Sequence, residues 1–178
     1  ISGLIGFGMI FGGHKILRGR NLALTAAYSG LLAQYKDYRK KVIEKLGEEI
    51  GALLKGGDVI AYSGGLGAGK TTITRGVSTG LGLGDEVTSP TFSLVNEYVG
   101  NSLTLYHFDM YRITSPDDLE TTGFYDYMDG ESVLAIEWSE NIESELPKSA
   151  IRIEIARLDE NTREITIDGD ERFADIGD

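Results

Sequence analysis

The residues with the clearest chemistry are eight consecutive ones, Gly64-Gly65-Leu66-Gly67-Ala68-Gly69-Lys70-Thr71. They match the phosphate-binding pattern G-x-x-x-x-G-K-[ST] at every fixed position. Glycines in such a loop let consecutive backbone N–H groups converge on phosphate oxygens without clashes from Cβ atoms. Lys70 would then reach the β- and γ-phosphates, and the Thr71 hydroxyl would hold Mg²⁺. The pattern therefore predicts a nucleoside triphosphate site with a magnesium ion.

The chain around this loop has the context that the pattern requires. Residues 58–63 form a short apolar run typical of a strand, and residues 72–81 are expected to be helical. A helix in that place points its positive N-terminal end at the same anion. The alternative is a glycine-rich turn with a chance lysine, which the flanking strand and helix disfavour.

Two carboxylates are candidates for holding the metal and the attacking water. Glu137 follows the apolar strand expected over residues 132–136, and Asp109 ends the strand expected over residues 103–109. A carboxylate at the carboxyl edge of a buried strand is the usual second element of a nucleotide site. Either one could lie beside Mg²⁺ while the other orients water. The alternative for each is a surface carboxylate at a strand end.

Two further features are candidates for contacts with the nucleotide. Ser89-Pro90-Thr91 is either a switch-like loop, in which Ser89 or Thr91 senses the γ-phosphate, or a plain turn. Trp138 follows Glu137 and is expected either beside the nucleotide or in the core.

For three other residues we favour a structural or surface role over a functional one. His107 lies in an alternating strand, where a structural histidine with satisfied nitrogens is expected. Arg75 and Arg112 are candidate phosphate contacts, with a surface role as the default. No arginine stands out as one that completes the site within this chain.

The composition excludes several classes of site. The chain has 178 residues and no cysteine, so disulfides, zinc fingers and thiol catalysis are excluded. Histidine occurs only at His14 and His107, which excludes a multi-histidine metal centre.

The charge changes sign along the chain. Residues 1–46 contain eight Lys/Arg and two Asp/Glu, a net charge of +6, whereas residues 47–178 contain nine and 26, a net charge of −17. A domain that acidic repels the phosphate backbone of a nucleic acid. We therefore expect the chain to bind a nucleotide locally, through its loop, and not to grip nucleic acid by itself.

The N-terminal segment differs from the rest. Residues 1–13 are apolar and glycine-rich, and they are too few to span a bilayer, which needs about 20 residues. A membrane contact, if the chain makes one, would use residues 1–20, although nothing in their composition establishes it. Residues 21–54 are expected to be helical, because an apolar stripe at helical spacing runs from Leu24 to Tyr38.

From residue 58 onward strand and helix patterns alternate. Strands are expected over residues 93–98 and 103–109 as one hairpin, and over 151–158 and 163–167 as another. Ser115-Pro116-Asp117-Asp118 is a capping box, which predicts a helix from Pro116 to Thr121. The tail after Asp168 is acidic and is expected to be loose.

With these residues in place, residues 46–173 resemble the TsaE (YjeE) family, the small bacterial P-loop ATPases of tRNA threonylcarbamoyladenosine biosynthesis. The resemblance is carried by Gly64-Gly65-Leu66-Gly67-Ala68-Gly69-Lys70-Thr71-Thr72, Ser89-Pro90-Thr91-Phe92, Tyr106-His107-Phe108-Asp109-Met110-Tyr111-Arg112 and Glu137-Trp138. Their shared order and spacing are far more specific than the glycine loop alone.

The resemblance implies a cytoplasmic ATPase that depends on partners. It implies ATP and Mg²⁺ as cofactors and the TsaD and TsaB proteins as partners, with tRNA reached only through that complex. Lys70, Asp109 and Glu137 would be the catalytic residues, and Thr71, Glu137 and Asp109 would hold the metal. The nucleotide would contact residues 64–72, Thr91 and Trp138.

Two departures from the family pattern follow. Gly65 stands where the family usually has an acidic or amide residue, and the strand that opens the family is not evident before the helix expected from about Leu46. Residues 1–44 resemble instead an uncharacterised family of small phage membrane proteins, through residues 20–28.

We therefore predict an α/β fold with a P-loop NTPase-like mixed central sheet, flanked by helices, and an appended N-terminal helix. The expected parts are an N-terminal segment over residues 1–45, the ATPase domain over 46–173 and an acidic tail over 174–178. The alternatives to an ATPase are a catalytically weak nucleotide-binding scaffold subunit and a small-molecule kinase.

Overall fold

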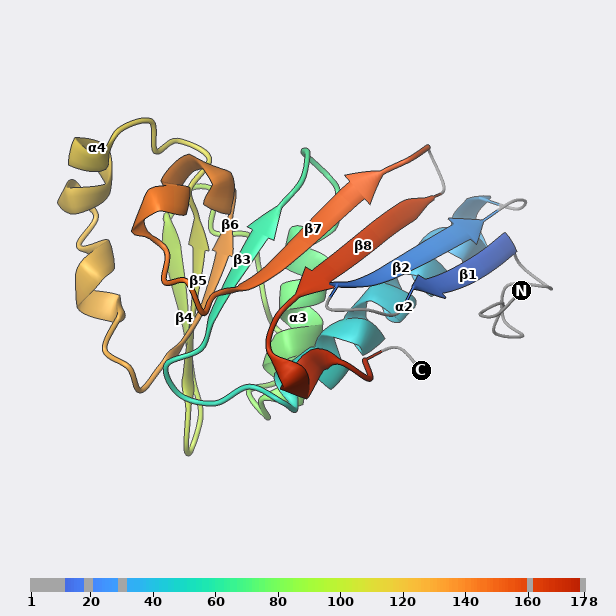
Figure 1. The fold of residues 1–178 in the computed structure, drawn as a ribbon, viewed down its shortest axis with the longest axis horizontal. Helices are drawn as coiled ribbons and strands as arrows, with labels where there is room; N and C mark the ends of the chain where they lie inside the picture. Colours follow the sequence, from blue (N-terminus) through green and yellow to red (C-terminus); the bar gives the residue numbers. More distant parts are fainter. Residues whose placement is uncertain (1–11, 18–20, 29–31, 160–161, 177–178) are drawn as a thin grey trace.

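The structure is a computed structural model, which describes residues 12–17, 21–28, 32–159 and 162–176. Its centre is an eight-stranded sheet in the order β1-β2-β8-β7-β3-β6-β5-β4 (Figure 1). The strands are β1 (Gly12–Leu17), β2 (Asn21–Tyr28), β3 (Val59–Ser63), β4 (Val95–Val99), β5 (Thr104–Asp109), β6 (Val133–Glu137), β7 (Ile151–Arg157) and β8 (Arg163–Asp168). The helices are α2 (Leu32–Gly51), α3 (Lys70–Gly80) and α4 (Pro116–Thr121), with 3-10 turns η1 (Phe124–Tyr127), η2 (Ser139–Glu145) and η3 (Glu171–Phe173).

The centre of the sheet is parallel and its flanks are antiparallel. Strands β7, β3, β6 and β5 run in one direction, while β4 pairs antiparallel with β5 and β8 antiparallel with β7. The carboxyl ends of the parallel strands therefore share one edge, which is where ligands bind in open α/β sheets.

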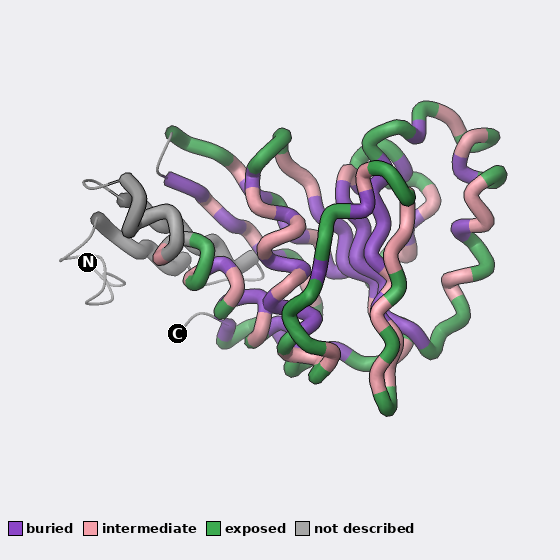
Figure 2. Tube along the Cα trace, turned by 180° about the vertical axis from the view of Figure 1, so that it is seen from behind, coloured by how far each residue is buried: buried purple, intermediate pink, exposed green. Residues whose placement is uncertain are grey.

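Apolar clusters on both faces of the sheet make a three-layer fold (Figure 1). Helices α2 and α3 cover one face, where Ile50, Ile73 and Ile153 are among the buried residues. The short helix α4 and the turns η1 and η2 cover the other face, which buries Phe108 and Phe124. Figure 2 shows that the central strands are buried along their length, whereas the α4 region alternates between buried and exposed residues.

Helices α2 and α3 approach each other closely because glycines line their contact. A Cβ atom on Gly76 of α3 would collide with the carbonyl oxygen of Glu44 in α2, and one on Gly47 would collide with that of Ile73. Arg75 adds an ion pair with Glu44, with an N–O distance of 3.1 Å. The helix that precedes β3 is thus locked onto the helix that follows the glycine loop.

Most of the elements expected from the sequence are confirmed. The strand before the glycine loop and the helix after it are β3 and α3, and the two hairpins are β4–β5 and β7–β8. The expected helix from Pro116 to Thr121 is α4, and the hydroxyl of Ser115 accepts a hydrogen bond from the backbone N–H of Asp118 at 3.1 Å, as a capping residue does.

The helix predicted over residues 21–54 is wrong at its start. Residues 21–28 form strand β2, which pairs antiparallel with β8, and the helix begins at Leu32. The expectation that no strand precedes the helix is wrong for the same reason. The segment Asn21–Tyr28 fits both helical and alternating spacing, and the free edge of β8 decides between them by offering a row of unpaired backbone groups.

The expectation of a loose tail after Asp168 is also wrong as far as Ile176. Phe173 and Ile176 are buried in the cluster beneath α2 and α3. Arg172 pairs with Asp58, just before β3, with an N–O distance of 2.8 Å. Residues 172–176 therefore close the core on the side where β3 begins.

Most of the apolar N-terminal segment, including residues 1–11 and 18–20, lies outside the described residues. Among the described residues, no helix has the length and apolar character needed to cross a membrane.

Removal of residues 1–44 tests the division after residue 45, which falls inside α2. We expect the melting temperature to fall by about 10 °C, since loss of the buried Ile43 contacts alone costs about 2–5 kcal/mol. Removal of residues 1–17 is the matched control, because it deletes β1 and keeps β2 and α2. Equal melting temperatures for the full chain and the chain without residues 1–44 would support a domain boundary after residue 45.

Candidate functional site

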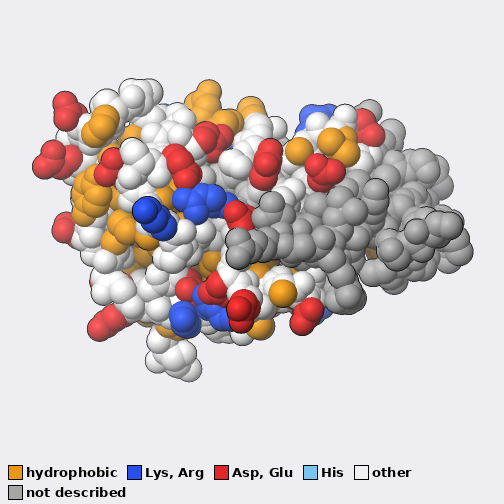
Figure 3. Space-filling view, in the orientation of Figure 1, with side chains coloured by type: hydrophobic (Ala, Val, Ile, Leu, Met, Phe, Trp, Pro, Cys, Tyr) orange, Lys and Arg blue, Asp and Glu red, His pale blue; other side chains and the backbone are white. Residues whose placement is uncertain are grey.

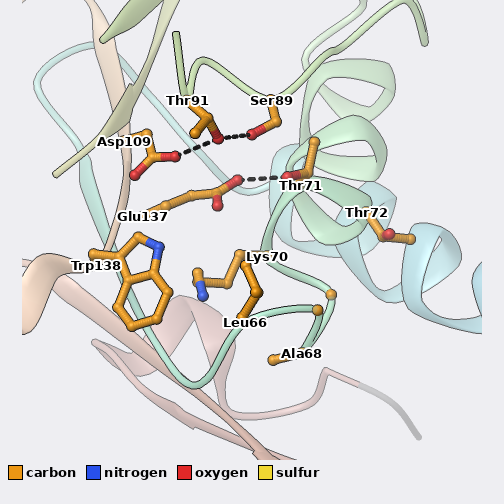
Figure 4. Close-up of a pocket in the computed structure, with 12 residues that line it drawn as sticks. Leu66, Ala68, Lys70, Thr71, Thr72, Ser89, Thr91, Asp109, Glu137 and Trp138 are labelled. Carbon is orange, nitrogen blue, oxygen red and sulfur yellow. Dashed lines mark hydrogen bonds between the residues drawn. The ribbon is translucent and has the colours of Figure 1, made fainter. Parts of the chain in front are cut away.

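The glycine loop follows β3 and leads directly into α3. Gly64 has a φ of +134°, and a Cβ atom there would collide with the carbonyl oxygen of Ile155 in β7. Only glycine allows both the turn and this close approach to the neighbouring strand. The loop is thus seated against the sheet, and its free side faces the pocket drawn in Figure 4.

Lys70, at the start of α3, is held back along the loop. Its ammonium group donates to the carbonyl oxygens of Gly64 at 2.6 Å and Gly65 at 3.1 Å, and it lies 4.0 Å from the centre of the Trp138 ring. Burial lowers the pKa of Lys70 below its ordinary value of 10.5, against the opposing attraction of Glu137. A phosphate in the pocket would stabilise the charged form of this lysine.

Thr71 connects α3 to the sheet. Its hydroxyl donates to Oε1 of Glu137 at 2.7 Å (Figure 4). Glu137 is the last residue of β6 and is 5% exposed. His107, on the neighbouring strand, lies with Nε2 2.9 Å from the same oxygen. The carboxylate is therefore fixed from the helix and from the adjacent strand.

Asp109 connects the sheet to the switch-like loop. Its Oδ2 accepts from the Thr91 hydroxyl at 2.7 Å, and its Oδ1 accepts from the backbone N–H of Tyr111 at 3.0 Å. Since the only proton of the Thr91 hydroxyl goes to Asp109, Ser89 donates to Thr91 across 2.7 Å (Figure 4). Asp109 and Glu137 lie directly opposite each other in the β5–β6 register.

Trp138 adopts a left-handed backbone conformation with a φ of +59°, which is uncommon for a bulky residue. Its ring packs against Tyr111, with centroids 4.9 Å apart. A strained turn of this kind is found where the surrounding structure overdetermines it, as at binding sites. Here it turns the indole towards Lys70 at the mouth of the pocket.

Nearly all the site residues predicted from the sequence meet in one pocket. It is lined by Leu66, Gly67, Ala68, Gly69, Lys70, Thr71, Thr72, Ser89, Thr91, Asp109, Glu137 and Trp138. Gly64 and Gly65 are not among the lining residues, and they contribute the carbonyl groups that hold Lys70.

The two arginines considered as phosphate contacts lie elsewhere. Arg75 binds Glu44 and the carbonyl oxygen of Val87, and Arg112 is exposed, with its guanidinium 5.9 Å from the Phe92 ring. Arg112 thus has the surface position expected of it, whereas Arg75 is half-buried and joins α3 to α2 and to the loop at Val87.

Sequence reasoning missed two contacts at this edge. Arg163 of β8 is 5% exposed and donates to the carbonyl oxygen of Ala68 at 3.3 Å, behind the glycine loop. No local pattern points to that contact, because residues 68 and 163 are far apart in the chain. The second missed contact is that of His107 with Glu137. The sequence did carry a signal for it, because residues two apart in a strand share a face and His107 is two residues from Asp109.

The protein oxygen atoms at this site suit a hard cation such as Mg²⁺, which would also bind phosphate oxygens and water. Within the part of the chain that the structure describes, no three His, Cys, Asp or Glu residues cluster closely enough to hold a metal ion alone. Magnesium sites in nucleotide-binding proteins commonly use one or two protein oxygens together with phosphate oxygens and water. The Thr71 hydroxyl and the Glu137 carboxylate fit that requirement, and Asp109 is close by in the register.

A second, larger hollow, of about 490 Å³ against about 230 Å³, is less suited to phosphate. Its charged lining consists of Glu140, Glu143, Glu154 and Asp168 with a single arginine. That arginine, Arg152, is paired with Glu143 at 2.7 Å. On the face drawn in Figure 3, Asp and Glu side chains are scattered over the described surface, whereas Lys and Arg form only small groups.

The parallel strands, the glycine loop after β3 and the carboxylates at the ends of β5 and β6 are those of the P-loop NTPase class, a nucleotide-binding fold. Within this class, the family model of the threonylcarbamoyl adenosine biosynthesis protein TsaE matches residues 38–165. The chain belongs to the TsaE family.

Individual relatives agree with the family match. The chain is 43% identical over 121 residues to the tRNA threonylcarbamoyladenosine biosynthesis protein TsaE of Treponema pallidum, covering 68% of this chain and 89% of the relative. It is 44% identical over 126 residues to that of Bacillus subtilis, covering 71% and 77%. The crystal structure of YdiB from Bacillus subtilis is similar with a TM-score of 0.62 at 31% identity, covering 86% of each chain.

A second family model, for a family of unknown function (DUF6353), matches residues 1–55. It overlaps the TsaE match over residues 38–55, most of which belong to α2. The two matches therefore meet inside one helix.

Substitution of single glycines in the loop tests how closely the loop packs against β7. We expect Gly64→Ala to lower the melting temperature clearly, by about 2–4 °C for each kcal/mol lost, because it combines a positive φ with a collision against β7. Gly65→Ala is the matched control, since a Cβ atom there meets nothing within 4 Å among the described residues. Thermal unfolding of both variants measures the difference, and equal melting temperatures would contradict the packing described here.

Proposed function

We propose that the chain is the ATP-hydrolysing subunit of the machinery that makes threonylcarbamoyladenosine in tRNA, working in the cytoplasm with ATP and Mg²⁺. One observation carries the proposal. The loop lysine, the Thr71–Glu137 hydrogen bond and Asp109 surround a single pocket in a chain of the TsaE family. The curated relatives are named for that biosynthesis.

The phosphates would bind between the glycine loop and Lys70. The backbone N–H groups of the loop and the N-terminal end of α3 attract the anion, and Lys70 exchanges its carbonyl partners for phosphate oxygens. Trp138 bounds the pocket beside Lys70, where it excludes water from the charged groups.

Mg²⁺, when bound beside Thr71 and Glu137, neutralises charge that develops on the phosphates. In this proposal Glu137 would hold the metal on its side of the pocket, and Asp109 would orient the attacking water. Because Asp109 also binds Thr91, a change in the loop 88–91 would move this carboxylate. The loop can thereby report on whether a γ-phosphate is present.

Partners complete this proposal. No arginine among the described residues lines the pocket, so the positive charge that other P-loop enzymes bring to the transition state must come from elsewhere. We propose the TsaD and TsaB proteins for this role. The acidic composition of residues 47–178 fits a subunit that reaches tRNA only through such partners.

Phosphate release at saturating ATP tests the assignment. We expect slow hydrolysis by the full chain alone and a rate at least about tenfold higher with TsaD and TsaB, because the partners complete the site. Lys70→Ala should bind ATP much more weakly than the unmodified chain, as measured by isothermal titration in the presence of Mg²⁺. It should therefore release no phosphate above background. Equal rates with and without partners would refute partner dependence, and absence of hydrolysis in every mixture would favour a nucleotide-binding scaffold subunit.

The two carboxylates should affect turnover more than binding. We expect Glu137→Gln and Asp109→Asn each to lower kcat by about 100-fold or more, because they act on the metal and the water in the transition state. The dissociation constant for ATP should change far less. Glu140→Gln is a matched control, since Glu140 is exposed and does not line this pocket. A carboxylate variant with near-normal kcat in the complex would show that its residue is not catalytic.

A further inference from the structure

His107 is a buried polar residue that the mechanism above leaves without a part. It lies in β5 and has no exposed surface. Along this strand, Leu105 belongs to the cluster beneath α2 and α3, while Phe108 belongs to the cluster on the opposite face. Since residues two apart share a face, His107 faces the α3 side with Leu105 and Asp109.

The hydrogen bond of His107 has a defined direction. Its Nε2 lies 2.9 Å from Oε1 of Glu137. An ionised carboxylate only accepts hydrogen bonds, so Nε2 carries the proton and donates it. The other ring nitrogen, Nδ1, takes no part in this bond.

That second nitrogen contradicts the expectation of a satisfied structural histidine. Nδ1 is buried and has no hydrogen-bond partner among the described residues. A buried polar atom without a partner destabilises the fold. An apolar side chain at position 107, like that of Leu105 on the same face, would avoid this loss of stability. What the histidine offers in return is the N–H at Nε2, which is directed at a carboxylate of the pocket.

The effect on Glu137 is to fix one of its two oxygens. Oε1 accepts from His107 on one side and from Thr71 on the other, at 2.9 Å and 2.7 Å. No hydrogen bond from the described residues reaches Oε2, and Figure 4 shows that oxygen pointing into the pocket, away from Thr71. Two donors at one oxygen restrict rotation of the carboxylate and leave the other oxygen available.

We propose that His107 is a positioning residue, which donates through Nε2 to Glu137 and holds the free oxygen of that carboxylate towards the metal. The inference rests on the proposed function, in which Glu137 is a metal ligand. If Thr71 turns to the metal, as its part in the site requires, His107 becomes the remaining donor that keeps Glu137 in place. The hydrogen-bonded partners of metal ligands generally support affinity and activity in this way.

Two substitutions of nearly equal length separate positioning from packing. His107→Gln keeps an N–H donor near the place of Nε2, whereas His107→Met has similar size and no donor. Ser78→Ala is the control, because Ser78 is another buried polar residue whose Oγ has no partner among the described residues. For each full-length variant, Mg²⁺ is titrated into the chain saturated with a non-hydrolysable ATP analogue, and kcat and KM are measured with TsaD and TsaB.

We expect His107→Met to weaken Mg²⁺ binding and to lower kcat by about 10- to 100-fold, with little change in KM. His107→Gln should recover most of both, and Ser78→Ala should match the unmodified chain. Unchanged Mg²⁺ affinity in His107→Met, or equal losses in the Met and Gln variants, would overturn the inference and leave the ATPase assignment standing. Lack of hydrolysis by the unmodified complex would instead overturn that assignment, and the Mg²⁺ titration would still decide the part of His107.

Discussion

The hydrogen bond from Thr71 to Glu137 is the point on which the site depends. It joins the first turn of α3 to the end of β6 across 2.7 Å, so the two groups proposed to share the metal lie together at the sheet edge. The parallel pairing of β3, β6 and β5 makes this contact available, because it brings three strand ends to one edge. Antiparallel pairing of any of these strands would have sent its functional residue to the opposite end of the sheet.

The charges around this contact explain how an acidic protein can hold an anion. Lys70 is buried beside carboxylates, and its pKa is lowered by burial despite their attraction. The loop amides and the α3 terminus add partial positive charge without adding basic residues to the surface. These groups give the pocket positive charge of its own, while Asp and Glu side chains are scattered over the described part of the face drawn in Figure 3.

The N-terminal part of the chain is more closely integrated than its charge and composition indicate. Strand β2 extends the sheet at β8, and α2 packs on α3 through facing glycines. Residues 172–173 do the same near the start of β3, since Arg172 binds Asp58 and Phe173 enters the core. These two segments therefore support β3 and α3, the two elements between which the glycine loop is held.

The sequence by itself determined the elements whose signals are local. The glycine pattern, the capping box at Ser115 and the apolar strand before Glu137 each depend on neighbouring residues, and β3, α3, α4 and β6 lie where these signals place them. The pairing of Asp109 with Thr91, the bond from His107 to Glu137 and the contact of Arg163 with the loop were decided only by tertiary structure. The same is true of residues 21–28, whose own preferences suit a helix as well as a strand. Local propensity leaves such a segment undetermined, and the unpaired edge of β8 makes it a strand because backbone groups there need partners.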